Sequence, residues 1–71
     1  MNLENKIVNV VSLSVVTYPP EARVTINVSE EIMEGVFKTI GTYDMKFDIL
    51  FHSASDPALL NLIYEKLAQL P

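Results

Sequence analysis

The chain contains no set of residues that could cross-link a small fold. Among its 71 residues there is no cysteine and only one histidine, His52. Disulfides are therefore excluded, and we expect no structural zinc site, which normally takes about four Cys or His ligands. A domain of this size buries only about 60% of the surface that its unfolded chain exposes, so its stability is marginal. The sequence therefore predicts either very regular packing or association with another subunit.

Charge and hydropathy exclude two classes of partner. Nine acidic and five basic side chains give a formal net charge of −4, and the five bases are scattered along the chain. Sequence-independent nucleic-acid binding depends on clustered Lys and Arg, so we expect no direct contact with nucleic acid. No apolar run reaches the roughly 18 residues that a membrane span requires, and residues 1–6 do not resemble a signal peptide. We therefore expect a protein without a membrane partner that is cytoplasmic, or part of a phage particle if it is a virion component.

Two strands are expected in the first half of the chain. Lys6–Thr17 is apolar and β-branched and has no helical period, which is typical of a long strand. Ala22–Ser29 alternates between apolar and polar side chains, which is typical of a half-buried strand. The prolines Pro19 and Pro20 stop the first strand and favour a hairpin turn between the two.

Residues 30–40 carry two conflicting signals. At 100° per residue, five apolar side chains fall on one arc, which predicts an amphipathic helix: Ile32, Met33, Val36, Phe37 and Ile40. Ser29 is a suitable N-cap for this helix, and Gly41 is suitable just after its end. The alternative is a strand with Gly35 at a bulge, because Val36, Phe37, Thr39 and Ile40 all favour strands.

The last third of the chain predicts a strand followed by a helix. Thr42–His52 alternates, with aromatic and aliphatic side chains on one face. Asp56 is placed as an N-cap and Pro57 as the first helical residue, so we expect a helix from Pro57 to about Leu70.

The expected fold is a single α+β domain, a two-layer sandwich with the order β-β-α-β-α. A right-handed crossover would make the second and third strands parallel, and placing the first strand between them makes each neighbouring pair antiparallel. This gives a three-stranded sheet in the order 2-1-3 with two helices on one face. The alternative is a four-stranded meander followed by the C-terminal helix.

The expected sheet has one uncovered face. The outer strands would contribute Arg23, Thr25, Asn27, Asp44, Lys46, Asp48, Leu50 and His52 to it, and the central strand Val8, Val10, Ser12, Ser14, Val16 and Tyr18. The last helix has an apolar arc wider than one contact needs, flanked by Leu62 and Tyr64. The candidate interface is therefore Val8, Val10, Ser12, Val16, Tyr18, Leu50, Leu62 and Tyr64. The alternative is that neighbouring side chains cover the valines and that the helix is simply well buried.

The sequence does not predict an enzyme. Ser12 or Ser14, His52 and Asp48 would share a face, but Asp48 and His52 lie about 13 Å apart along a strand and cannot pair directly. Glu30, Glu31 and Glu34 are typical of a solvated face. We expect no catalytic residue, no cofactor and no metal site.

Two functions follow from these observations. The first is a non-enzymatic assembly module, a homo-oligomer or a small subunit of a larger complex; its size suits a minor component of a phage particle. The second is a small acidic inhibitor, either a host-defence antagonist or a nucleic-acid mimic. Its carboxylates would engage a basic site on a target protein: Glu30, Glu31, Glu34, Asp44 and Asp48. Salt distinguishes the two, because only a charge-driven complex weakens steeply with ionic strength.

Overall fold

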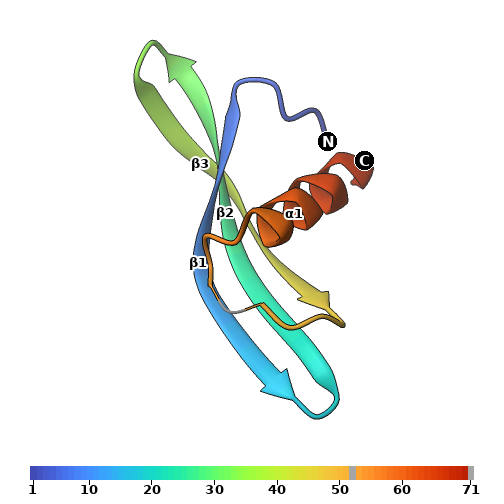
Figure 1. Ribbon diagram of the computed structural model, residues 1–71. Coiled ribbons are helices and arrows are strands. Elements are labelled where there is room, and N and C mark those ends of the chain that lie inside the picture. The colour runs from blue at the N-terminus through green and yellow to red at the C-terminus, as the bar shows by residue number, and fades with distance from the viewer. Residues whose placement is uncertain (52, 71) are drawn as a thin grey trace.

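The fold is a three-stranded antiparallel sheet with a helix across one face (Figure 1). The computed structural model describes residues 1–51 and 53–70. In this part of the chain the elements are β1 (Lys6–Thr17), β2 (Pro20–Met33), β3 (Val36–Phe47) and α1 (Pro57–Gln69). The strands lie in the order β1-β2-β3, so each strand pairs with its neighbour along the chain. The result is a small mixed α+β fold.

The predicted strand order 2-1-3 and the predicted helix over residues 30–40 are both wrong. β2 runs on to Met33, the chain turns at Glu34 and Gly35, and β3 starts at Val36. Gly35 has a φ of +75°, a conformation that favours glycine. A hairpin needs no crossover, so β3 pairs with β2 and not with β1. The four-stranded alternative is also wrong, because residues 30–40 extend two long strands and do not form an additional one.

The strand preference of these residues prevailed over their helical period. Val36, Phe37, Thr39 and Ile40 are β-branched or aromatic, and Val36, Phe37 and Thr39 pair with residues of β2. The final strand is shifted by the same change: it ends at Phe47 instead of His52, and residues 48–51 are not a strand. His52 lies outside the described residues.

The first hairpin agrees with the sequence prediction. β1 spans the expected residues, Thr17 pairs with Pro20, and Tyr18 and Pro19 form the turn, with a cis peptide bond between them.

An extra residue interrupts the ladder near the middle of β1. Val10 pairs with Ile26, whereas Ser12 pairs with the next residue, Thr25, so Val11 forms a β-bulge. The bulge reverses the alternation of side chains. Before it, the even-numbered residues share a face with the buried Ile26; after it, the odd-numbered residues do.

This bulge corrects the predicted composition of the open face. Val8 and Val10 lie on the helix side of the sheet and pack against the core. Ser12 and Ser14 lie on the open side, as expected. The predicted row of valines on the open face is therefore wrong for Val8 and Val10, whereas Val16, which pairs with Glu21, does lie on that face.

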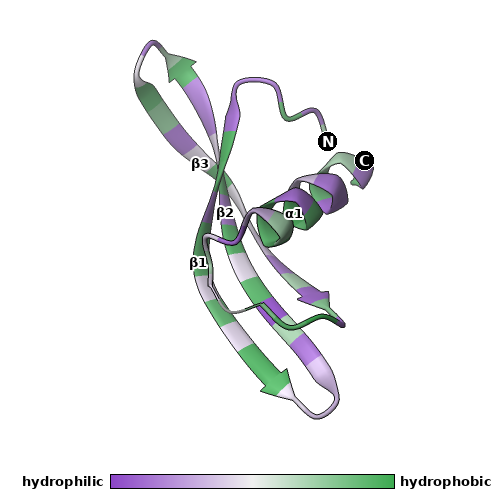
Figure 2. Ribbon diagram, in the orientation of Figure 1, coloured by the Kyte–Doolittle hydropathy of each residue, from purple (hydrophilic) through white to green (hydrophobic). Residues whose placement is uncertain are grey.

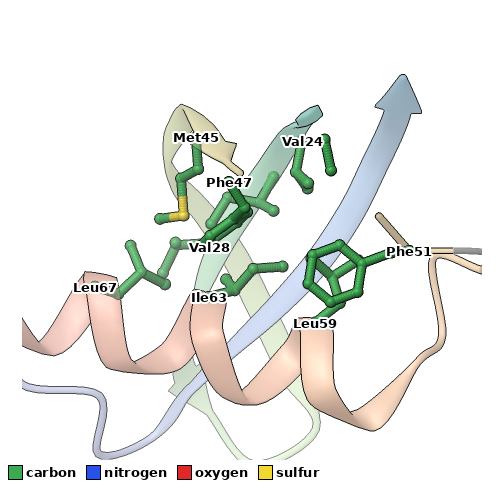
Figure 3. Close-up of a cluster of buried hydrophobic side chains, with 10 residues drawn as sticks. Val24, Val28, Met45, Phe47, Phe51, Leu59, Ile63 and Leu67 are labelled. Carbon is green, nitrogen blue, oxygen red and sulfur yellow. The ribbon is translucent and has the colours of Figure 1, made fainter. Parts of the chain in front are cut away.

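The core lies between β2, β3 and α1 (Figure 3). Its buried members are Ala22, Val24, Ile26, Val28, Met45, Phe47, Phe51, Leu59, Ile63 and Leu67. The last three recur every four residues and form one face of α1. The Phe51 ring meets Phe47, the last residue of β3, edge-on, with centroids 6.1 Å apart, so the chain returns to the core after it leaves β3.

The start of α1 is confirmed. The Asp56 side chain accepts a hydrogen bond of 2.9 Å from the Ala58 backbone N–H, and Pro57 occupies the first turn. At the other end, Lys66 donates to the Lys46 carbonyl oxygen at 3.4 Å, and its Nζ lies 5.2 Å from the centre of the Phe47 ring. The N-terminal ammonium of Met1 donates to the carbonyl oxygens of Ala68 and Leu70.

Candidate interaction surfaces

The open face of the sheet is polar and its side chains pair across the strands. Thr25 Oγ1 donates to Asp44 Oδ1 at 2.6 Å, and Thr42 Oγ1 donates to Asn27 Oδ1 at 2.8 Å. A shallow depression of about 480 Å³ on this face is lined by Ser12, Ser14, Arg23, Val24, Thr25, Asp44, Met45 and Lys46. Because Thr25 pairs with Asp44 and Asn27 with Thr42, the middle of this face has little apolar surface to offer a partner.

A cluster around Glu21 illustrates the same point. Its carboxylate lies 3.4 Å from Arg23 Nε and 3.2 Å from Lys46 Nζ. The hydrogen bond from Lys46 holds the pKa of Glu21 below its ordinary value of 4.5; partial burial opposes this, and the charge of Arg23 adds to it. These opposite charges are paired with one another within the sheet, so they do not form a charged site for a ligand.

The serines and Asp48 of the hypothesised catalytic site do not lie together. Ser12 and Ser14 lie on the open face beside Arg23 and Thr25, whereas Asp48 follows the end of β3. Among the described residues, no three His, Asp or Glu side chains are placed to hold a metal ion. In the same part of the chain, no helix has the length and hydropathy to cross a bilayer.

The first apolar surface is the end of the β2–β3 hairpin, here called the arm (residues 31–40). Every residue of the arm is exposed, although several are large and apolar: Ile32 (59%), Met33 (62%), Val36, Phe37 (44%) and Ile40. β1 begins opposite Glu30, which pairs with Lys38 on its other side, so residues 31–37 of the arm have only two strands, and α1 lies well away from the arm (Figure 1). The apolar colouring at the tip of the hairpin is visible on both strands in Figure 2.

The second apolar surface is the outer edge of β1, here called the β1 edge (residues 7–17). Four of its aliphatic side chains are exposed: Ile7, Val11, Val15 and Val16. No charged side chain occurs in this stretch. The opposite edge of the sheet, β3, carries Lys38, Asp44 and Lys46. The two edges therefore differ in character.

The predicted interface residues do not form one patch. Val8, Val10 and Leu62 are half-buried against the core. The other five are exposed but dispersed: Ser12 and Val16 on β1, Tyr18 at the first turn, Leu50 after β3 and Tyr64 on α1.

Sequence reasoning missed the arm because it predicted a helix for these residues, with their apolar side chains on its buried face. The available signal was Gly35, a turn residue directly before the β-favouring residues Val36 and Phe37.

Comparison of the chain with family models, curated proteins and solved structures found no match. Its function therefore has to be argued from its surfaces.

Proposed function

We propose that the chain is a non-enzymatic protein-interaction module that assembles into a homo-oligomer or serves as a small subunit of a larger complex. The observation that carries this proposal is the arm, in which Ile32, Met33 and Phe37 project into water.

The physical argument concerns what stabilises the arm. A two-stranded hairpin without a third strand or a covering helix is at best marginally stable in water. Side chains as exposed as Ile32 (59%) and Met33 (62%) contribute little burial energy to the isolated chain. Contact with another molecule would both bury these side chains and support the ladder. Contiguous apolar patches on small proteins mark interaction sites for this reason.

The shape of the molecule supports the same proposal. Its principal extents are 44 × 22 × 18 Å, and its accessible surface is 4864 Å². A compact monomer of this mass exposes about 4,450 Å². The excess is consistent with strands that extend beyond the helix that covers them.

The charge arrangement gives less support to an acidic inhibitor. In the strand register, Glu30 lies between Lys6 and Lys38. Glu21 pairs with Arg23 and Lys46. A target with a basic site would thus meet mixed charge along these strands and not a field of one sign.

Light scattering coupled to size exclusion tests the proposal. We expect wild-type protein to form species heavier than the 8.0 kDa monomer, at low and at high salt, or to bind another subunit in extracts of its native host. The arm variant Met33→Glu/Val36→Lys replaces an opposed apolar pair by an opposed charge pair, so the hairpin is retained. We expect this variant to form smaller species than wild type.

The matched control is Asn27→Glu/Thr42→Lys, the same exchange at an opposed pair on the polar face. It should behave as wild type. Wild-type protein that stays monomeric at every concentration and binds nothing in a native extract would contradict the proposal. An assembly that the arm variant leaves unchanged would contradict the role of the arm.

A further inference from the structure

We propose that the partner at the β1 edge is a second copy of this chain, bound through its own β1 in antiparallel orientation about a two-fold axis perpendicular to the sheet. This inference rests on the proposed assembly function and names the partner of one of its surfaces.

The first observation is that the backbone of β1 is open along its outer side. β1 is an edge strand that pairs with β2 alone. Among the described residues, the other backbone hydrogen bond to β1 is a local turn from Lys6 N–H to the Leu3 carbonyl oxygen at 3.1 Å. Natural sheets protect such edges with charged residues, prolines or bulges. Residues 7–17 contain neither charge nor proline, so the Val11 bulge is their one protective feature.

The second observation is that the Val11 bulge favours β1 of a second copy over any other strand as a partner. A regular strand cannot form an unbroken ladder with an edge that carries an extra residue at its centre. A second copy has its own extra residue at the same place. In antiparallel orientation about a two-fold axis, the two Val11 bulges meet at the axis.

The third observation is the pattern of side chains on either side of the bulge. A two-fold axis perpendicular to the sheet maps each face onto itself, so opposed residues must come from the same face. Because the alternation reverses at Val11, each residue before the bulge then meets one after it. The pairs formed with the second copy are Val8 with Val15 and Val10 with Leu13 on the helix side, and Ile7 with Val16 and Asn9 with Ser14 on the open side. Apolar residues meet apolar residues, and polar residues meet polar ones.

The fourth observation is incomplete burial on the helix side. Val8, Val10 and Leu13 are only half-buried and Val15 is 41% exposed, although their face is the one that is fully buried along β2. A second β1 would cover them and continue the apolar layer across the axis. No like charges are brought together along the strand, despite a net charge of −4 on each copy, because Lys6 would lie opposite Thr17.

Disulfide trapping tests the register. The chain has no cysteine of its own, so only the introduced thiols can form a disulfide. Asn9→Cys and Ser14→Cys place thiols at exposed positions on the open face. Opposed residues have Cβ atoms about 4.5–5.5 Å apart, close enough for a disulfide after small adjustments. We expect an equimolar mixture of the two single variants to give a covalent dimer under mild oxidation. Either variant alone should give about tenfold less, because its thiols lie far from the axis.

A mixture of Asn9→Cys with Thr17→Cys is the register control, since Thr17 lies opposite Lys6 in the proposed pairing, three residues beyond Ser14, the residue opposite Asn9, and on the other face of the sheet. Cross-linking of this mixture to the same extent, or no cross-linking of the first mixture, would overturn the proposal.

A second variant does not depend on disulfide geometry. Val11→Glu places one carboxylate from each copy beside the axis, at a side chain that is 57% exposed and therefore dispensable for the fold, which circular dichroism would verify. We expect the dissociation constant of the dimer to rise about tenfold or more, because like charges meet without counter-ions in the pair. Ile49→Glu, at a similarly exposed residue after β3, should leave it unchanged.

The outcomes separate the two proposals. If wild-type protein assembles but neither the trapping nor Val11→Glu behaves as expected, the β1 pairing is wrong and the assembly function stands. If wild-type protein is monomeric and binds nothing in a native extract, both are wrong.

Discussion

Gly41 lies where β3 passes close to the ring of Tyr43. A Cβ at Gly41 would lie 2.9 Å from Tyr43 Cε2 and 3.0 Å from its hydroxyl oxygen. Gly41→Ala must therefore displace a half-buried ring that packs on the core, and we expect a loss of about 1 kcal/mol of unfolding free energy. Urea denaturation would measure it. In a Tyr43→Ala background the cost should largely disappear, and equal costs in the two backgrounds would contradict the contact.

The ion cluster around Glu21 predicts a small dependence of stability on pH. The pKa of Glu21 is lowered in the folded protein, so its stabilising contribution is present above pH 4.5 and is lost as the pH falls through the folded value. In Lys46→Met we expect this pKa to return towards 4.5, because the hydrogen bond from Lys46 is its main cause. NMR titration of the Glu21 carboxyl would measure the change. Lys38→Met, at a residue outside the cluster, is the control and should leave the titration unchanged.

The Val11 bulge shows where sequence reasoning stops at this scale. In the sequence, every second residue from Val8 to Ser14 belongs to one continuous alternation, and no residue in that run indicates a bulge. The register with β2 places it, because Ile26 and Thr25 need partners on opposite faces. The sequence alternation therefore predicts the wrong face for the interface residues Val8 and Val10 and the right face for Ser12.

At the scale of elements, the N-cap of α1 gives a direct test. The Asp56 carboxylate accepts from the Ala58 N–H, so Asp56→Ala should cost about 1 kcal/mol of unfolding free energy. Asp56→Asn keeps an acceptor oxygen and should cost much less. Both values come from urea denaturation. Equal losses in the two variants would show that the cap does not contribute.

Helix α1 was predictable because independent signals agree on it: a cap residue, a proline in the first turn and one apolar face through Leu59, Ile63 and Leu67. The arm was not, because its apolar residues satisfy the helical period and also the strand preference. Such a conflict is resolved by pairing with a neighbouring strand, here β2, which a period cannot show.

At the scale of the whole molecule, assembly should appear in thermal unfolding. If two copies pair through β1, the unfolding midpoint of wild-type protein rises with protein concentration, because mass action favours the folded dimer. Val11→Glu, whose dimer is weaker, should unfold at a lower midpoint than wild type at the same concentration. Far-UV circular dichroism suits this measurement, since the chain has no tryptophan. A concentration-independent midpoint for wild type would argue against pairing.

The global topology depends on one local choice. Once residues 30–40 form a hairpin instead of a helix, β3 returns beside β2 and the order 1-2-3 follows without a crossover. The two-layer architecture with the C-terminal helix on the sheet survives this change. The predicted sheet order, the predicted strand ends and the predicted location of the exposed apolar residues are all changed by it.

The extra residue at the centre of β1 also bears on aggregation. Without Val11, residues Val10 and Ser12 would alternate regularly, and each face would keep its present side chains. The edge would then be straight and uncharged from Ile7 to Thr17, a template on which any extended chain could add and on which fibrils grow. The Val11 bulge thus restricts pairing at the uncharged edge of β1 to a strand that carries the same bulge.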